Sequence, residues 1–310
     1  MPPVTVSKFC HQALIYGSDQ AFQQATTGFC LDGLGAGEKV LAVTTEANIA
    51  LLRDSLGPDA GRVEFVMARD WYDSPGRTLS AYNRYVAVHR RLHGTVRIIG
   101  EPVWEGRTPP EENEWTRYES VLNAAFVRSP AWILCPYDAR RLPAQIVADA
   151  RRTHPHVVTG AGTRDSDAYS DPADFLSSDD RLPTAPPHAM KIPFDADLSS
   201  MRRRLSAHAT ELGMTAGQIE SLVLAVNEVA TNTVQSGAGH GDIALWINGP
   251  TVVCDVFDSS RLPSPLLCYV PPEPGAARGH GLWAVHQLCD LVQIRSGPEG
   301  TRFRLHLTIA

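Results

Sequence analysis

The sequence contains no apolar run of the roughly 20 residues that a membrane-spanning helix needs. Its first residues lack a basic segment followed by a long apolar stretch, so we do not expect a secretory signal. Basic residues are not in excess, because 28 Lys and Arg stand against 34 Asp and Glu and give a net charge of −6. No electrostatic basis for binding nucleic acid follows from that balance. We expect a cytoplasmic protein that binds neither membranes nor nucleic acid.

Cysteine pairs with CxxC spacing are also absent. The six cysteines are scattered, at positions 10, 30, 135, 254, 268 and 289, so we expect reduced, buried thiols and no disulfide framework. A metal site built from Cys10, His11, Cys135, His154 and His156 is an alternative for part of this set. Only His154 and His156 have a ligand-like spacing, which favours a structural role for these residues.

The 310 residues are long for one domain, and 43% of them are hydrophobic, which is typical of globular proteins. Residues 159–187 are rich in Gly, Ser, Asp and Pro, so they form the predicted linker. We therefore expect one domain over residues 1–158 and a second over residues 188–310.

Residues 1–158 alternate helical and strand patterns. Helices are expected over 18–34, 46–56, 78–93, 112–128 and 143–153, with strands over 39–45, 63–67, 96–100 and 131–135. Strands separated by helices predict an α/β domain with a mainly parallel sheet covered on both faces. The glycines at 33, 35 and 37 do not form a phosphate loop, because they follow a helix and precede a strand.

Polar and aromatic residues follow the predicted strands, where parallel α/β sheets commonly hold ligands. The predicted sensory pocket for a small molecule consists of Trp71, Tyr72, Glu101, Trp104, Tyr118, Glu119, Cys135, Tyr137, Asp138 and His154. The alternative is that these side chains only pack helices onto the sheet.

Several segments of this half carry a family resemblance. YGSDQAF, GEKVLAVTTEAN, WYDSPGRTL, RIIGEPVW, EWTRYESVLNAAF, CPYDARRLP and THPHV occur in this order within residues 8–158. They resemble the MEDS sensory domain family. The resemblance implies an input module with an α/β fold related to the RecA-like ATPases but without a working phosphate loop.

The second half is organised around a helix that begins at Thr215. Its apolar residues recur at three- and four-residue intervals, and Glu228 and Asn232 project side by side at the edge of that face. The helix precedes strands over 242–248 and 251–258, a Pro-rich loop, a helix opened by Gly279 and Gly281, and strands over 293–296 and 301–308. With a strand over 190–194 and a helix over 198–212, this order predicts helices on one face of a largely antiparallel sheet.

Three parts of this half fit a nucleotide site: Glu228 with Asn232, Asp258 at a strand end, and glycines at a helix N-terminus, where phosphate is favoured. NEVATN, VFDSS, RGHGLWAVHQLCDLV and GTRFRLHL resemble the GHKL ATP-binding domains of the anti-sigma factor serine kinase branch, over residues 190–310. The resemblance implies a Bergerat-type two-layer α/β sandwich that binds ATP with Mg²⁺.

The same resemblance assigns roles to individual residues. Asn232 would hold the Mg²⁺ that bridges the ATP phosphates, Asp258 would accept from the adenine amino group, and Glu228 would be the general base. Gly279, His280, Gly281 and Leu282 would wrap the phosphates, Arg261–Arg278 would form the lid, and Thr301 would complete the nucleotide site. Implied partners are a STAS-type anti-anti-sigma protein, a sigma factor, or both, and the kinases of this branch commonly form homodimers.

One position departs from the family pattern. The family continues its aspartate as Asp-x-Gly, whereas this chain has Asp258-Ser259-Ser260, and a Cβ at residue 260 would crowd the adenine or require a different turn. We expect a signalling regulator whose sensory domain controls an ATP-dependent serine kinase domain. The alternative is a catalytically idle interaction module with a ligand-sensing N-terminal domain.

Overall fold

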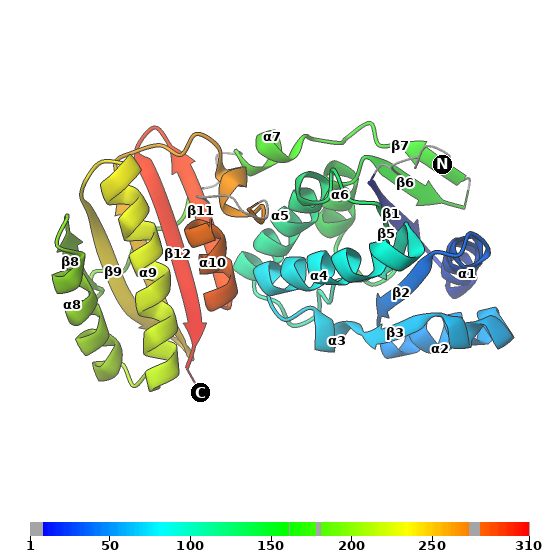
Figure 1. The fold of residues 1–310 in the computed structure, drawn as a ribbon, viewed down its shortest axis with the longest axis horizontal. Coiled ribbons are helices and arrows are strands. Elements are labelled where there is room, and N and C mark those ends of the chain that lie inside the picture. The colour runs from blue at the N-terminus through cyan, green and yellow to red at the C-terminus, as the bar shows by residue number, and fades with distance from the viewer. Residues whose placement is uncertain (1–8, 161, 178–180, 273–279, 310) are drawn as a thin grey trace. The chain divides into compact units, whose positions relative to one another are not determined.

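The computed structural model describes residues 9–160, 162–177, 181–272 and 280–309. These residues divide into two compact units, Met1–Phe175 and Leu176–Ala310 (Figure 1). In the described part of the chain no helix has the length and the apolar character needed to cross a membrane.

The N-terminal unit is built on a seven-stranded sheet of order β3-β2-β4-β5-β1-β6-β7. Its strands are β1 (Cys10–Tyr16), β2 (Lys39–Thr44), β3 (Glu64–Met67), β4 (Val96–Gly100), β5 (Ala131–Asp138), β6 (His156–Thr159) and β7 (Gly162–Asp165). All neighbouring strands pair in parallel except β6 and β7. The predicted α/β domain with a mainly parallel sheet is confirmed.

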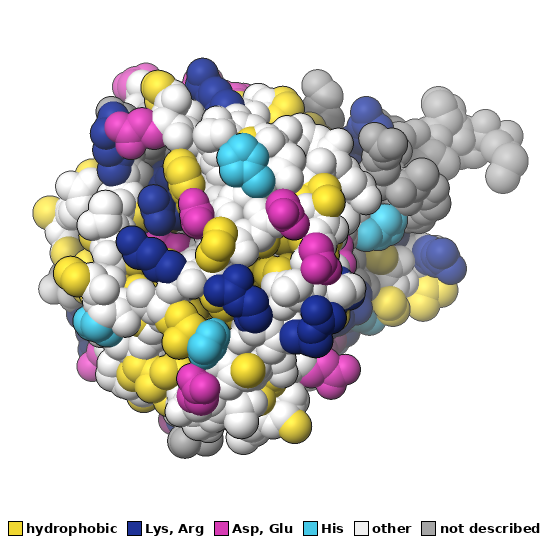
Figure 2. All heavy atoms as spheres, turned by 90° about the vertical axis from the view of Figure 1, so that its left-hand side faces the viewer, with side chains coloured by type: hydrophobic (Ala, Val, Ile, Leu, Met, Phe, Trp, Pro, Cys, Tyr) yellow, Lys and Arg dark blue, Asp and Glu magenta, His cyan; other side chains and the backbone are white. Residues whose placement is uncertain are grey.

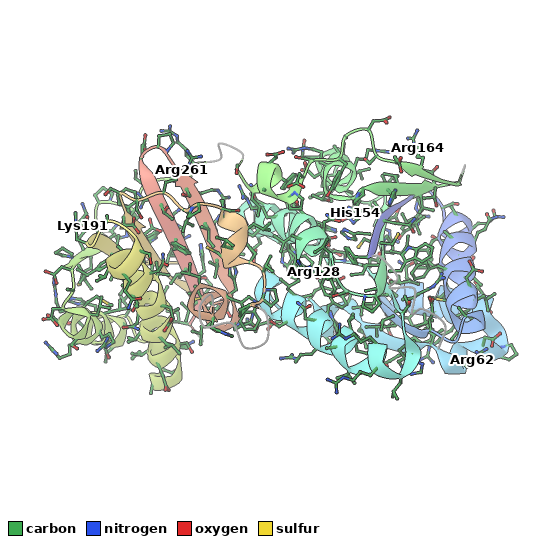
Figure 3. All side chains as sticks on the ribbon, turned by 45° about the horizontal axis from the view of Figure 1, so that its top comes forward. Arg62, Arg128, His154, Arg164, Lys191 and Arg261 are labelled. Carbon is green, nitrogen blue, oxygen red and sulfur yellow. The ribbon has the colours of Figure 1, made fainter. Side chains whose placement is uncertain are left out.

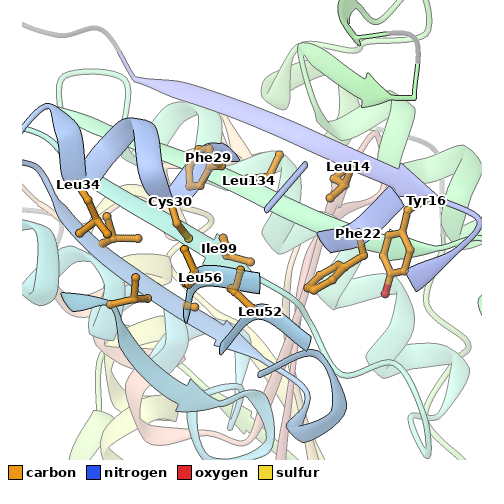
Figure 4. Packing of buried hydrophobic residues seen from close by; sticks show 13 residues of the cluster. Leu14, Tyr16, Phe22, Phe29, Cys30, Leu34, Leu52, Leu56, Ile99 and Leu134 are labelled. Carbon is orange, nitrogen blue, oxygen red and sulfur yellow. The ribbon is translucent and has the colours of Figure 1, made fainter. Parts of the chain in front are cut away.

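Helices connect these strands and cover the sheet (Figure 1). They are α1 (Asp19–Gly35), α2 (Glu46–Leu56), α3 (Ala68–Trp71), α4 (Pro75–His93), α5 (Pro109–Ala125), α6 (Ala144–Thr153) and α7 (Pro172–Leu176), with a 3₁₀ turn η1 (Gly57–Arg62). Ser18, Thr45 and Ser74 accept hydrogen bonds from the first turns of α1, α2 and α4, which fixes where these helices begin. Figure 4 shows the apolar core that α1 and α2 form with the sheet, around Phe22, Leu52 and Ile99.

The sequence analysis missed three strands of this sheet, β1, β6 and β7, and β1 lies between two other parallel strands. β1 pairs with both β5 and β6, but its segment CHQALIY carries polar side chains at His11 and Gln12 and lacks the apolar alternation of a strand. Both side chains are buried. Only Gly17 and Ser18 separate β1 from α1, which leaves no room for a phosphate loop at this strand-to-helix connection.

β5 also runs further than predicted, beyond Cys135 through Pro136 and Tyr137 to Asp138. A proline lacks the N–H group that a central strand uses, so the sequence places a strand end before Pro136. In the structure β4 pairs with β5 only as far as Leu134, so no donor toward β4 is needed at Pro136. Tyr137 and Asp138 therefore lie within a strand, not in the loop after it.

The C-terminal unit is a two-layer sandwich with a fully antiparallel sheet of order β11-β12-β10-β9-β8. Its elements are β8 (Met190–Phe194), α8 (Leu198–Glu211), α9 (Ala216–Ser236), β9 (Gly241–Asn248), β10 (Thr251–Asp258), η2 (Pro265–Cys268), α10 (His280–Leu288), β11 (Leu291–Gly297) and β12 (Gly300–Thr308). The helices lie on one face of the sheet (Figure 1). The predicted architecture of this half is confirmed.

The segment predicted as a linker does more than join the two units. β7 extends the N-terminal sheet, and Ala185 and Ala189 pack with Trp246 and Val253 on the helix-free face of the C-terminal sheet. Arg304 Nη2 donates to the carbonyl oxygen of Pro183 over 2.6 Å. Residues 183–189 therefore pack against the C-terminal sheet and belong to the C-terminal unit.

The surface of the C-terminal unit carries both signs of charge. Figure 2 shows Lys and Arg side chains interspersed with acidic and apolar ones on the side that carries α8 and β8. Arg203 and Arg204 of α8 are exposed, while Arg202 donates to Asn227 Oδ1 over 2.8 Å. The short basic run at 202–204 is thus part of a mixed surface.

Candidate functional site

α9 presents Glu228 and Asn232 at the border of its buried face. Thr215 forms a capping box with Gln218 at the start of the helix, and the apolar side chains Leu222, Val226 and Val229 are buried. Glu228 and Asn232 are half-buried. Within the described residues neither side chain makes a hydrogen bond or an ion pair. An acidic and an amide side chain are therefore available together on one helix surface.

The first turn of α10 approaches Glu228 directly. A Cβ added at Gly281 would collide with Glu228 Oε2, so any larger residue at this position would require the Glu228 side chain to move. Leu282 is half-buried and His280 is exposed. Gly279, which the sequence analysis also assigned to this turn, lies outside the described residues. The Glu228 carboxylate thus lies against the N-terminal turn of α10, where negative charge is stabilised.

Asp258, the last residue of β10, is held by both of its carboxylate oxygens. Oδ2 accepts a hydrogen bond from Thr233 Oγ1 of α9 over 2.7 Å, and Oδ1 accepts from the backbone N–H of Ser260 over 2.7 Å. The Ser260 hydroxyl also donates to Oδ1. Thr233 is a site residue that the sequence analysis missed. A polar side chain among the inward-facing apolar positions of α9 is the signal that could have found it.

Ser260 adopts a conformation that does not require glycine. Among the described residues every positive φ belongs to a glycine, so the turn at residue 260 is one that a residue with a Cβ can adopt. The side chain instead turns toward Asp258. Its effect on a ligand would be competition for Asp258 Oδ1.

A chain of hydroxyl groups anchors the residues that follow Asp258. Thr301 lies opposite Asp258 in the β10–β12 register and donates to the carbonyl oxygen of Ser260 over 2.8 Å. Ser296 Oγ lies 2.9 Å from Thr301 Oγ1 and accepts from the N–H of Leu262 over 2.9 Å. These bonds give Thr301 a positioning role next to Asp258.

The loop that the sequence analysis assigned as a lid is anchored in its described part. Cys268 of η2 is buried, and the ring of Tyr269 packs on His286 of α10 at 4.6 Å between centroids. Burial lowers the pKa of His286 to about 4, so this imidazole is neutral at neutral pH. Residues 273–278 of the loop lie outside the described residues.

A cavity of about 500 Å³ lies at the β11–β12 turn. It is lined by Arg261, Arg295 and Arg302 together with Phe257 and Glu299, among others, and neither Glu228 nor Asn232 contributes to it. Figure 3 labels Arg261 near this turn. Ser296 lines the cavity and bonds to Thr301, so the cavity borders the Asp258 end of the candidate site.

In the N-terminal unit, two of the proposed pocket residues make structural bonds at strand ends. Glu101 accepts from the Thr44 hydroxyl and from Asn48 Nδ2 over 2.9 Å, which ties β4 to the start of α2. Asp138 accepts from Arg140 Nε over 2.8 Å, and these contacts lower the pKa of Asp138. Both carboxylates are thereby engaged within the chain.

The aromatic members of the proposed pocket pack against one another. Tyr72 and Tyr118 both contact Trp115 edge-on, with ring centroids 5.4 and 5.1 Å apart. Trp104 packs on Tyr137 at 6.4 Å. Burial raises the pKa of Tyr72 and Tyr118 well above the usual value. Trp71 is half-buried and lies beside Tyr82. These rings fill the space near the strand ends.

The remaining three proposed residues, Glu119, Cys135 and His154, meet in the interior, and His11 joins them. Figure 3 labels His154 of this cluster. All four are at most 1% exposed. Burial, with the neighbouring His154, lowers the pKa of His11 to about 4. Burial raises the pKa of Cys135 well above its usual value. The sequence analysis did not place His11 in the pocket, because it did not recognise β1 as the strand beside β5.

Comparison with known proteins agrees with the division into two domains. Residues 10–155 match the family model of MEDS, the MEthanogen/methylotroph, DcmR Sensory domain. Residues 194–307 match the model of the histidine kinase-like ATPase domain. No curated protein matches the chain.

One solved structure that the chain resembles is the crystal structure of the RsbU and RsbW domains of Rv1364c from Mycobacterium tuberculosis. The identity is 22%, the TM-score is 0.31, and the match covers 40% of this chain. The chain spans 32% of the length of that structure. The two family matches, and not this likeness, carry the assignment of the two domains.

Proposed function

Because the chain joins a MEDS sensory domain to a histidine kinase-like ATPase domain, we propose that it is a signalling regulator whose N-terminal domain controls ATP-dependent chemistry in its C-terminal domain. The pairing itself supports a regulatory signalling role. The observation that carries the proposal is the juxtaposition of Glu228 with Gly281, beside an Asn232 that has no hydrogen bond within the described residues.

The roles proposed for the side chains follow from their positions. Asn232 offers an oxygen ligand to a Mg²⁺ ion that accompanies ATP. Gly281, with Gly279, His280 and Leu282, receives the phosphates at the start of α10. Asp258 accepts from the adenine amino group, and Thr233 and Thr301 position it or the residues that follow it. Bound Mg²⁺ would neutralise phosphate charge, and the protein's share of phosphoryl transfer is mainly positioning.

We further propose that the acceptor is a serine hydroxyl of a protein partner. Glu228 is the one carboxylate at this position with no partner in the described chain, so it can accept the hydroxyl proton as a general base. A STAS-type anti-anti-sigma protein is the proposed substrate, and a sigma factor is the proposed target of sequestration. The resemblance of NEVATN, VFDSS and RGHGLWAV to the anti-sigma serine kinase branch supports this choice.

One observation favours a second candidate function, an idle interaction module that uses this fold without nucleotide. Both oxygens of Asp258 are already engaged, and Ser260 supplies two of the bonds to Oδ1. An adenine amino group would have to compete with the Ser260 hydroxyl. Nucleotide binding is therefore the property that separates the two candidates.

Thermal unfolding of the full chain with and without ATP and Mg²⁺ tests the proposal. A ligand present at one hundred times its dissociation constant stabilises the bound fold by about 2.7 kcal/mol. We expect a shift in the C-terminal transition that Asn232→Ala abolishes. Glu220→Ala, an exposed carboxylate on the same helix, is the matched control and should keep the shift. If millimolar ATP produces no shift, the nucleotide proposal is wrong and the idle interaction module is the function that remains.

Phosphoryl transfer is then measured with a purified STAS-type protein and labelled ATP. Loss of a general base costs about 10²- to 10⁴-fold in rate. Glu228→Gln should therefore lower transfer by that factor while ATP still stabilises the protein. If Glu228→Gln removes ATP binding as well, Glu228 is a binding residue and its proposed role as a base is wrong.

A further inference from the structure

We propose that the N-terminal domain holds a zinc ion between His11, Glu119, Cys135 and His154. These residues come from four elements: β1, α5, β5 and the C-terminal end of α6. One ligand atom from each lies within 4.8 Å of all the others. Figure 3 shows His154 in the interior of this unit. The inference concerns a different domain from the ATP proposal and does not depend on it.

Three distances between the ligand atoms match the edges of a zinc tetrahedron. Zinc binds nitrogen and oxygen at about 2.0–2.2 Å and sulfur at about 2.3 Å, so tetrahedral edges are about 3.3–3.6 Å. Glu119 Oε2 lies 3.5 Å from His11 Nε2 and 3.4 Å from His154 Nε2. Cys135 Sγ lies 3.4 Å from His11 Nε2. Three of the six edges therefore have the length expected for zinc, and the other three are no longer than 4.8 Å.

Both imidazoles are oriented by bonds on their far side. His11 Nδ1 lies 3.1 Å from Asn123 Oδ1, and His154 Nδ1 lies 2.8 Å from the carbonyl oxygen of Ala150. An N–H on Nδ1 would donate to each oxygen, which leaves the lone pair of Nε2 pointing at the centre of the cluster. Histidine ligands of metals are usually held in this way, by an oxygen acceptor behind the ring.

The cluster also lacks the hydrogen bonds that buried polar groups require. Both carboxylate oxygens of Glu119 are buried and lack a hydrogen-bond partner among the described residues. The same holds for His154 Nε2. Without a cation, an ionised Glu119 would leave a negative charge in the interior at a cost of several kcal/mol. A divalent ion satisfies these atoms at once.

The charges balance when zinc binds. Zinc displaces the proton of the Cys135 thiol, and that proton leaves to solvent. The ion then carries two positive charges against one thiolate and one carboxylate, with two neutral imidazoles, and the site is neutral overall. Four protein ligands leave no open coordination position, which is typical of zinc that stabilises a fold and not of a hydrolytic centre. The ion would join two neighbouring strands of the sheet to α5 and α6.

Metal analysis of the full chain tests the site. The protein is produced in medium supplemented with Zn²⁺, and separately with Co²⁺, and is purified without chelators. We expect about one metal ion per chain, and for Co²⁺ the intense visible bands of a tetrahedral complex with a thiolate-to-metal charge-transfer band. If the folded wild-type protein contains no metal from either preparation, the proposal is wrong. The four side chains would then form a buried polar cluster without an ion.

Variants locate the ion. Cys135→Ser should remove the charge-transfer band, and His154→Gln should lower the metal content at least tenfold. Cys30→Ser, a second fully buried thiol of the same domain, and His156→Gln, which bonds to Asp165 instead, should change neither. Circular dichroism verifies that each variant is folded. Metal that survives in both folded ligand variants would place it elsewhere and refute the assignment.

Discussion

The two domains treat their functional side chains in opposite ways. In the N-terminal domain His11, Glu119, Cys135 and His154 are sealed inside the protein, whereas in the C-terminal domain Glu228 and Asn232 remain half-exposed on one helix. A sealed polar cluster is stable only if its members compensate one another or share an ion. A half-exposed pair can be solvated until a ligand arrives. The first arrangement suits a permanent component and the second an exchanging nucleotide.

The C-terminal domain also buries a charge, and it does so with complete pairing. Asp255 is 1% exposed and accepts from Arg304 Nε over 2.6 Å and from Arg302 Nη1 over 2.8 Å. Among the described residues Glu119 faces two imidazoles and the Cys135 thiol, and no arginine or lysine pairs with it. Pairing within the chain is thus complete at Asp255 and incomplete at Glu119.

The largest effect is expected from the substitution that removes the fully paired carboxylate of Asp255. Asp255→Ala leaves two arginines without their carboxylate, and breaking a buried pair costs about 3–5 kcal/mol. The transition of the C-terminal domain in urea should move to lower concentration, and that of the N-terminal domain should stay. Asp242→Ala, an exposed carboxylate on neighbouring β9, is the control. Equal effects of the two variants would contradict the importance assigned to the buried pair.

A smaller effect concerns the pH dependence of the C-terminal domain. The pKa of His286 is lowered to about 4 in the folded state, by burial, from an ordinary value near 6.5. The unfolded chain therefore binds the extra proton first, so stability is intact above pH 6.5 and falls as the pH drops toward 4. The loss attributable to His286 is about 3 kcal/mol at most.

His286→Phe keeps a ring against Tyr269 and removes this titration. Between pH 6.5 and pH 4 the wild type should lose more unfolding free energy than the variant. The variant should therefore gain stability relative to the wild type as the pH falls. The measurement is urea unfolding at several pH values. Parallel pH profiles of the two proteins would show that His286 is not buried as neutral imidazole.

The smallest expected effect is on nucleotide affinity. Ser260→Ala removes the hydroxyl that donates to Asp258 Oδ1 and leaves the backbone N–H bond in place. A hydrogen bond contributes about 0.5–1.5 kcal/mol, so ATP should bind about two- to tenfold more tightly. Ser259→Ala, its exposed neighbour, should have no effect. Calorimetry with Mg²⁺ and ATP measures the affinity of both variants. An unchanged affinity of Ser260→Ala would show that the Ser260 hydroxyl does not compete with adenine.

Local pattern explains why most of the fold is predictable. α9 has apolar side chains at helical spacing and a capping box, and β2 and β4 are nearly continuous apolar runs, as buried parallel strands are. β1 lacks this signal because His11 and Gln12 occupy buried positions. Such polar residues become understandable only when their partners on other elements are known.

The candidate sites differ in the same respect. Glu228 and Asn232 are four residues apart on one helix, so a sequence pattern alone brings them together. His11 and Cys135 are 124 positions apart and meet only because β1 and β5 pair in parallel, with Ala13 opposite Cys135. Cys10 and His156, which share the sequence neighbourhood, do not join them. Cys10 is half-exposed, and His156 bonds to Asp165.

The sequence by itself determined the two domains, their fold classes and the polar pair on α9, because each depends on the spacing of residues within a single element. Only the tertiary structure decided that His11 joins Glu119, Cys135 and His154 in one buried cluster. It also decided that the Ser260 hydroxyl donates a hydrogen bond to Asp258 Oδ1. Both depend on strand register and on side-chain directions across elements. Burial then gives these contacts their weight, since a polar atom removed from water must be paired or must bind an ion.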